Sequence, residues 1–132
     1  MLKNSYILIT CITLFIGCSL PDTKKPIAMM EKYWSFYKTK QYDSLRSFYL
    51  KSAIPEEQFP KMFAVMEKLS NEVGNIIQIN LTRTSANNTT NEGKTVDLTY
   101  TAVHERGTVE YEFKLKALSD GEFKIQDQSF SK

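Results

Sequence analysis

The sequence lacks an excess of either charge, a long apolar run and a second histidine. Its 17 lysines and arginines and 15 aspartates and glutamates are interspersed along 132 residues, which gives a net charge of +2. A nucleic-acid-binding protein would show clustered lysine and arginine, so the sequence argues against a nucleic-acid partner. It contains no polybasic patch for a membrane surface either. The only histidine, His104, cannot supply the several His or Cys ligands of a zinc site. We expect no metal and no other cofactor.

An apolar stretch, residues 6–16, lies near the start of the chain behind Lys3. It has the length of a signal-peptide hydrophobic region and is shorter than the roughly 20 residues of a membrane-spanning helix. A polar, proline-containing stretch separates it from the next apolar pattern, which argues against a buried first element of the fold. No clear A-x-A cleavage site follows, and ordinary signal cleavage stays an alternative.

The end of this stretch resembles the lipobox of bacterial lipoproteins. The residues concerned are Leu14-Phe15-Ile16-Gly17-Cys18-Ser19. The resemblance implies that residues 1–17 are a lipoprotein signal peptide, that Cys18 becomes the acylated first residue, and that residues 18–26 form a tether. Small Gly17 suits the lipoprotein peptidase, whereas Phe15 departs from the usual leucine.

The resemblance also indicates a location. Ser19, in place of an aspartate, resembles the lipoproteins that are sorted to the outer membrane of Gram-negative bacteria. We therefore expect a lipid-anchored protein of the bacterial cell envelope, on the periplasmic face of the outer membrane if the host is Gram-negative. A tether of a few residues, each spanning at most about 3.6 Å, would hold the domain close to the bilayer.

The two cysteines leave no candidate disulfide under this interpretation. Cys11 lies inside the predicted signal peptide and would be removed, and the sulfur of Cys18 would carry the lipid. The stability of the domain must then come from its core. Residues 27–132 are close to the commonest domain size of about 100–150 residues, so we expect one domain.

Two segments after the tether show the apolar periodicity of helices. Asp22 or Thr23 can cap the first, Pro26 suits its first turn, and its end is expected near residues 39–40. Asp43 can cap a short second helix. The apolar positions are Ile27, Met30, Tyr33, Trp34 and Tyr37 in the first helix and Leu45, Phe48 and Tyr49 in the second.

A third helix is expected from about residues 55–57 to Gly74. Acidic residues lie at its start, where the helix dipole favours them, and Pro60 must fall in its first turn. Glycine is a common helix stop. The apolar positions are Phe59, Met62, Phe63, Met66, Leu69 and Val73.

After Gly74 the apolar period changes from about 3.6 to 2, which predicts strands. A polar hairpin loop over residues 86–93 and tight turns at residues 105–107 and 119–121 separate four of them. The inward positions are expected to be Ile77, Ile79 and Leu81; Val96, Leu98, Tyr100 and Ala102; Val109, Tyr111, Phe113 and Leu115; and Phe123 and Ile125. Each strand is apolar on one face, so the sequence predicts an α+β fold with three N-terminal helices packed on a four-stranded antiparallel meander.

Two stretches resemble the nuclear-transport-factor-2-like superfamily. They are Lys38-Thr39-Lys40-Gln41-Tyr42-Asp43-Ser44-Leu45, at the usual connection between its first two helices, and Phe123-Lys124-Ile125-Gln126-Asp127-Gln128-Ser129-Phe130, at its last strand. Gln41 stands where the family often has glycine or an acidic residue. The resemblance covers residues 27–130 and implies that the sheet is curved into a cone. This fold hosts isomerases, dehydratases, secretion components and binding modules, so the function must come from the site.

One carboxylate could act in such a cone. Asp127 shares its alternation with the inward residues before it, and could be a pocket acid beside Tyr100 or Tyr111. A buried carboxylate is costly unless it is paired. The favoured interpretation is that a bulge or the end of the sheet shifts the alternation here, in agreement with the opposite parity of Phe130.

The other candidates are aromatic or polar. Trp34 and Tyr37 belong to a set of aromatics that is mostly core filling, of which a minority could line an apolar pocket. His104 ends a strand beside a turn, and the favoured interpretation is a solvated turn residue. Asp97 alternates with inward residues and is expected at the surface. No catalytic constellation emerges.

Three functions are compatible with these features. The leading one is a non-catalytic, membrane-anchored envelope lipoprotein whose domain binds a small apolar ligand or an envelope protein. The second is a periplasmic immunity protein or inhibitor that blocks a protein toxin. The third is a small-molecule isomerase or dehydratase that uses Asp127 and a tyrosine. The polar outer face of the sheet favours a monomer or a weak dimer.

Overall fold

The computed structural model describes residues 20–132, and the predicted signal peptide and Cys18 lie outside them. The elements run in the order helices first, strands second. They are α2 (Lys24–Lys38), the 3-10 helices η2 (Tyr42–Phe48) and η3 (Glu56–Gln58), α3 (Phe59–Val73), β1 (Ile76–Thr89), β2 (Gly93–His104), β3 (Gly107–Ala117) and β4 (Phe123–Ser131).

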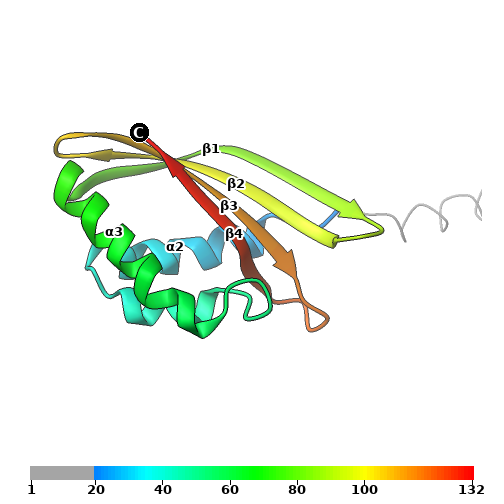
Figure 1. The fold of residues 1–132 in the computed structure, drawn as a ribbon. Coiled ribbons are helices and arrows are strands. Elements are labelled where there is room, and N and C mark those ends of the chain that lie inside the picture. The colour runs from blue at the N-terminus through cyan, green and yellow to red at the C-terminus, as the bar shows by residue number, and fades with distance from the viewer. Residues whose placement is uncertain (1–19) are drawn as a thin grey trace, which may run out of the picture.

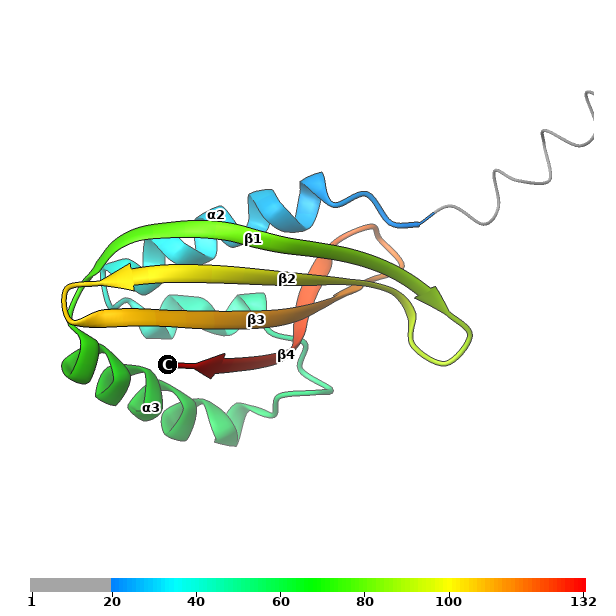
Figure 2. The same cartoon turned by 90° about the horizontal axis from the view of Figure 1, so that it is seen from above.

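The strands form one antiparallel sheet in the order β1-β2-β3-β4. The helices all lie on one side of this curved sheet (Figure 1). Seen from above, α2 lies toward the β1 edge and α3 toward the β4 edge (Figure 2). The predicted α+β class, the helix-before-strand order and the meander are confirmed.

The helix boundaries follow local chemistry. Thr23 is the N-cap of α2, and its side chain makes no capping hydrogen bond; the carboxylate of Asp22, one position earlier, accepts a hydrogen bond from the backbone N–H of Lys24 at 3.0 Å. The predicted cap at Asp43 is wrong, because Gln41 precedes η2 and Asp43 lies in its first turn, 2.7 Å from the Arg46 guanidinium. Pro60 lies in the first turn of α3, as predicted.

Gly74 ends α3 in a backbone conformation that only glycine adopts readily, with φ of +81° and ψ of −171°. A Cβ at this position would lie 2.5 Å from Oε2 of Glu105. Glu105 belongs to the turn between β2 and β3, and its N–H donates to the carbonyl of Asn75 at 3.0 Å. The end of α3 at Gly74 therefore also contacts the turn between β2 and β3.

Strand β1 departs from the predicted alternation. Register shifts at residues 76–78 and 81–83 interrupt its pairing with β2. As a result Ile77, expected to face inward, is 67% exposed, and Leu81 is exposed as well. The loop predicted over residues 86–93 is mostly strand, since β1 runs to Thr89 and β2 begins at Gly93. A β-bulge adds a residue and shifts which face each side chain takes, which strict alternation cannot anticipate.

Strand β4 contains the bulge that the sequence favoured. Leu115 pairs with Ile125 and Lys114 pairs with Asp127, so that Gln126 is an extra residue in β4. Asp127 is exposed, and Gln128 is half-buried. The inward series therefore continues from Ile125 to Gln128 and not to Asp127.

Candidate functional site

Four of the five predicted pocket residues meet inside the domain. The ring of Trp34 lies 5.2 Å from that of Tyr37, 5.5 Å from that of Tyr100 and 5.1 Å from that of Tyr111, in edge-to-face arrangements. All four side chains are buried. The three best-formed cavities within residues 20–132 are not lined by any of these four aromatics. They fill the space between α2 and the sheet as a packed core does.

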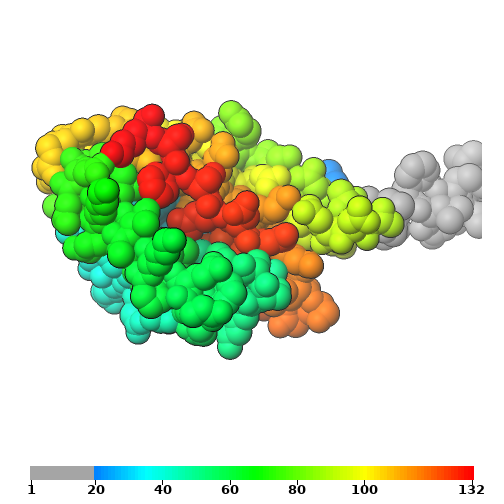
Figure 3. Space-filling model, in the orientation of Figure 1, coloured from blue at the N-terminus to red at the C-terminus, as the bar shows by residue number. Residues whose placement is uncertain are grey.

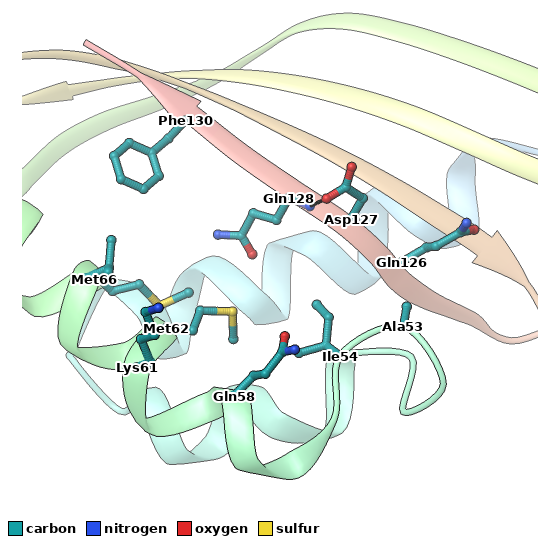
Figure 4. A pocket seen from close by; sticks show the side chains of 11 residues that line it. Ala53, Ile54, Gln58, Lys61, Met62, Met66, Gln126, Asp127, Gln128 and Phe130 are labelled. Atoms are coloured by element: carbon teal, nitrogen blue, oxygen red, sulfur yellow. Dashed lines mark hydrogen bonds between the residues drawn. The ribbon is translucent and has the colours of Figure 1, made fainter.

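Asp127 lies apart from these tyrosines. Its carboxylate accepts the backbone N–H of Gln128 at 2.8 Å, and in Figure 4 it points away from the space between α3 and β4. Tyr100 and Tyr111 point into the core instead. The structure therefore does not bring Asp127 together with Tyr100 or Tyr111 for the acid–base chemistry of an isomerase.

His104 is not the solvated turn residue that the sequence favoured. It is 4% exposed, and its Nδ1 lies 2.8 Å from the carbonyl oxygen of Gly74. Since a carbonyl only accepts, Nδ1–H donates, and Nε2 of the neutral ring accepts from the hydroxyl of Tyr111 at 3.3 Å. Tyr37 donates in turn to the oxygen of Tyr111 at 3.2 Å. This chain of hydrogen bonds is enclosed, which fits a structural role.

Asp97 keeps its predicted outward parity. Its carboxylate accepts a hydrogen bond from the side-chain amide of Asn87 at 3.1 Å, on the outer face of the sheet. It is half-buried there by its neighbours. Within residues 20–132 no group of three or more His, Cys, Asp or Glu side chains is arranged to hold a metal ion.

A second buried network links the helices to β4. Tyr49 donates to the side-chain carbonyl of Gln128 at 2.5 Å, and the hydroxyl of Tyr33 lies 2.8 Å from that of Tyr49. Burial raises the pKa of both tyrosines well above the ordinary value of 10.0. These hydrogen bonds hold the side chain of Gln128, after the bulge in β4, in one orientation.

A groove opens between α3 and the edge of β4. Its volume is about 590 Å³, and Figure 3 shows the face on which it opens, with α3 and the end of β4 at the surface. Figure 4 shows that side chains from both elements and from the segment before α3 surround it. The lining residues are Ala53, Ile54, Gln58, Lys61, Met62, Val65, Met66, Gln126, Asp127, Gln128 and Phe130.

The wall of the groove is largely apolar, with a few polar groups. Methionines and other apolar side chains form much of its wall, and Val65 and Phe130 are 43% and 39% exposed there. Gln126 and Gln128 contribute amides, and the side-chain oxygen of Gln126 is buried without a hydrogen-bond partner among the described residues. The lining contains no histidine, cysteine, serine or tyrosine that could act as a nucleophile or proton carrier.

The groove borders a strand edge. On one side β4 pairs with β3. On the other side, the backbone N–H of Leu50 donates to the carbonyl of Ile125 at 2.8 Å, and Tyr49 forms a single parallel bridge with Ile125. Among residues 20–132, no other segment forms a bridge or ladder with this edge between Gln126 and Ser131.

Sequence reasoning did not find this groove. Val65 lies outside the apolar stripe predicted for the third helix, and the alternation of β4 does not predict that Phe130 lines a groove. The one signal in the sequence is Val65, an apolar residue outside the apolar stripe of the third helix. That signal is weak by itself, since single exposed apolar residues are normal.

No family model matches the chain, and no curated protein sequence matches it. Among solved structures, the fold is similar to that of the helical cell shape determining protein Pgp2 from Campylobacter jejuni, with a TM-score of 0.49 and 12% sequence identity. The match covers 76% of this chain and 38% of that chain, so this chain spans well under half the length of that protein. Among the described residues no helix is long and apolar enough to cross a membrane.

Proposed function

We propose that this chain is a lipid-anchored protein of the bacterial cell envelope whose domain binds a partner in the groove between α3 and β4 and performs no catalysis. The observation that carries the binding role is the groove itself: apolar side chains, two of them well exposed, beside amides and an open strand edge. Exposed apolar surface in a concave site is typical of ligand or protein binding.

The lipid anchor is supported by the lipobox-like residues that end in Cys18. Within the described part, α2 begins at Lys24, only six positions after that cysteine, so the tether is short. We further propose that the domain is a variant of the nuclear-transport-factor-2-like cone. The helices α2, η2, η3 and α3 before a curved four-stranded sheet support this proposal.

A protein-blocking role, such as that of an immunity protein, is the second candidate. The open edge of β4 favours it, because unpaired backbone N–H and C=O groups attract another polypeptide. The two candidates share the groove, and they differ in whether the bound partner is a toxin.

The anchoring part is tested by growing the host with an alkyne-labelled fatty acid and detecting the label on the full chain. The expected result is labelling of the unaltered chain and none with Cys18→Ser. If the variant still carries the label, the lipid is on another residue and the proposal is wrong.

The binding part is tested with a photo-crosslinking amino acid placed at Val65 of the full chain in living cells. The matched control places it at Ile77, which is exposed and apolar but lies on β1 away from the groove. A discrete adduct at Val65 and none at Ile77 is expected, and its mass gives the kind of partner. Absence of an adduct at Val65 would overturn the binding role.

A further inference from the structure

We propose that the partner is an extended polypeptide segment of another protein, which adds to β4 as a fifth strand and places alternate apolar side chains in the groove. This inference rests on the proposed binding function and specifies its ligand.

The open edge of β4 is suited to pair with the backbone of another polypeptide. A strand at the border of a sheet presents a row of N–H and C=O groups on its open side. Within residues 20–132 no other strand pairs with that row along β4 after Ile125, although the N–H of Gln128 donates to the Asp127 carboxylate, which a bound peptide would have to displace or pass by. A small apolar molecule could fill the groove, but it would leave these groups without partners. A polypeptide satisfies both the backbone row and the apolar wall.

The segment at Leu50 makes one strand-type contact with the open edge of β4 and then turns away from it. Leu50 donates to the carbonyl of Ile125 at 2.8 Å, which is a strand-type contact with the outer edge of β4. The N–H groups of Ala53 and Ile54 then both donate to the carbonyl of Leu50, at 3.0 and 2.9 Å. This turn carries the chain away toward α3. A bound peptide would continue along the edge from the point where Leu50 leaves it.

The wall of the groove determines the side chains of the peptide. Met62 and Met66 of α3 lie across the groove from Phe130 of β4 (Figure 4), and Val65 of α3 lines the groove as well. Side chains of a strand alternate between two faces. Every second residue of the peptide would therefore contact this apolar wall, and the residues between would face away from it.

The charged groups of the groove indicate where the bound peptide is apolar and where it carries a charge. Lys61 is the cation that lines the groove, and it forms no ion pair with a carboxylate among the described residues. Asp127, the only carboxylate in the lining, turns away. We therefore expect apolar residues on the groove-facing side of the peptide and an acidic residue where it passes Lys61.

The length of the peptide follows from the open part of β4. The edge from Gln126 to Ser131 corresponds to about 20 Å at about 3.3 Å per residue. A segment of about six residues would occupy it. Recognition of this kind takes its affinity from main-chain hydrogen bonds and its specificity from pockets for alternate side chains.

The test begins with a displayed library of random ten-residue peptides, selected on the full chain in detergent. The selected peptides should show apolar residues at every second position. They should bind at least tenfold more weakly to the Val65→Asp chain. They should bind equally well to the Ile77→Asp chain, which adds the same charge at an exposed apolar position outside the groove. Val65→Ser provides a second variant if Val65→Asp fails to fold by circular dichroism.

Backbone pairing is tested with two synthetic versions of the best peptide, N-methylated at the odd or at the even positions. In a strand only alternate N–H groups point to a given neighbour. One methylated version should therefore lose binding at least tenfold, and the other should keep it.

The inference is overturned by any of three results: no enriched peptides, equal binding of both methylated versions, or self-association of the chain that is abolished by Val65→Asp. These results are separable from a failure of the binding function. An adduct at Val65 with the mass of a lipid or small molecule would keep the groove as a binding site and remove the peptide.

Discussion

The hydroxyl of Tyr111 lies 3.3 Å from Nε2 of His104, and both side chains are enclosed by the end of α3 and the sheet. The only histidine of the chain is thereby part of the interior. Its other ring nitrogen holds the carbonyl of Gly74, so the imidazole connects the helix stop to the phenols of β3 and α2.

Removing one buried hydroxyl should have opposite effects at two neighbouring tyrosines. Tyr111→Phe leaves His104 and Tyr37 without their shared partner and should lower the free energy of unfolding by about 1–3 kcal/mol. Tyr100→Phe removes a buried hydroxyl that has no partner among the described residues, and should be neutral or stabilising. Urea unfolding of both variants measures the difference. Equal losses at the two sites would contradict the hydrogen-bond assignment.

The free energy of unfolding should depend on the hydrogen-bonding groups of the side chain at position 104. His104→Leu removes the donor to Gly74 and the acceptor for Tyr111, and should cost about 2–4 kcal/mol because two buried groups lose partners. His104→Asn can restore a donor to Gly74 and should cost less. Thermal and urea unfolding give both values. If the leucine variant were as stable as the unaltered chain, the two hydrogen bonds assigned to the His104 ring would be wrong.

Alkaline pH should unfold the domain through its buried tyrosines. Burial raises the pKa of Tyr33, Tyr37, Tyr49 and Tyr111, and it raises that of Tyr100 to about 12. Above pH of about 10 the unfolded chain loses phenolic protons that the folded chain keeps, so the folded state binds more protons and stability falls as pH rises.

The size of the alkaline effect can be measured directly. Stability should be constant with respect to these groups below about pH 10, and each fully protected tyrosine adds a slope of at most about 1.4 kcal/mol per pH unit above it. Tyrosinate absorbance should rise together with the loss of circular dichroism. Ionisation of these tyrosines at pH 10 in the folded state would contradict their burial.

Gly74 should be far less replaceable than Gly93. Both have positive φ, +81° and +72°. An added Cβ at Gly74 would lie 2.5 Å from Oε2 of Glu105, whereas nothing lies within 4 Å at Gly93. Gly74→Ala should therefore lose about 1–3 kcal/mol for its backbone conformation and a further amount for the clash. Gly93→Ala should lose only about 1 kcal/mol, and unfolding curves of the two variants distinguish these values.

The sequence was sufficient for the order of the elements because each has a local cause. The six-residue apolar stripe before Gly74 predicts α3, and the change to a period of two predicts the strands. The strand interiors of β2 and β3 were also predictable, since Val96 and Val109 lie where alternation places them. The burial of Trp34 and Tyr37 followed from the same helical spacing.

The remaining features depend on contacts between distant segments. Ile77 faces outward because β1 has a register shift against β2, and such a shift depends on the pairing of two strands. His104 is buried because Gly74 lies beside it, thirty positions away in the chain. The groove depends on how far α3 lies from β4, and no local pattern encodes that separation.

The bulge in β4 also has a consequence for changes in chain length. Gln126 is the one residue of β4 that has no counterpart in β3. Its deletion would leave Ile125 inward, Asp127 outward and Gln128 inward, in ordinary alternation and with the same pairs across to β3. A single deletion at this position should therefore be tolerated, because no side chain would change face. A deletion one step later, at Asp127, would have the same outcome, with Gln126 as the outward residue. An insertion there would instead reverse the faces of every residue up to Ser131.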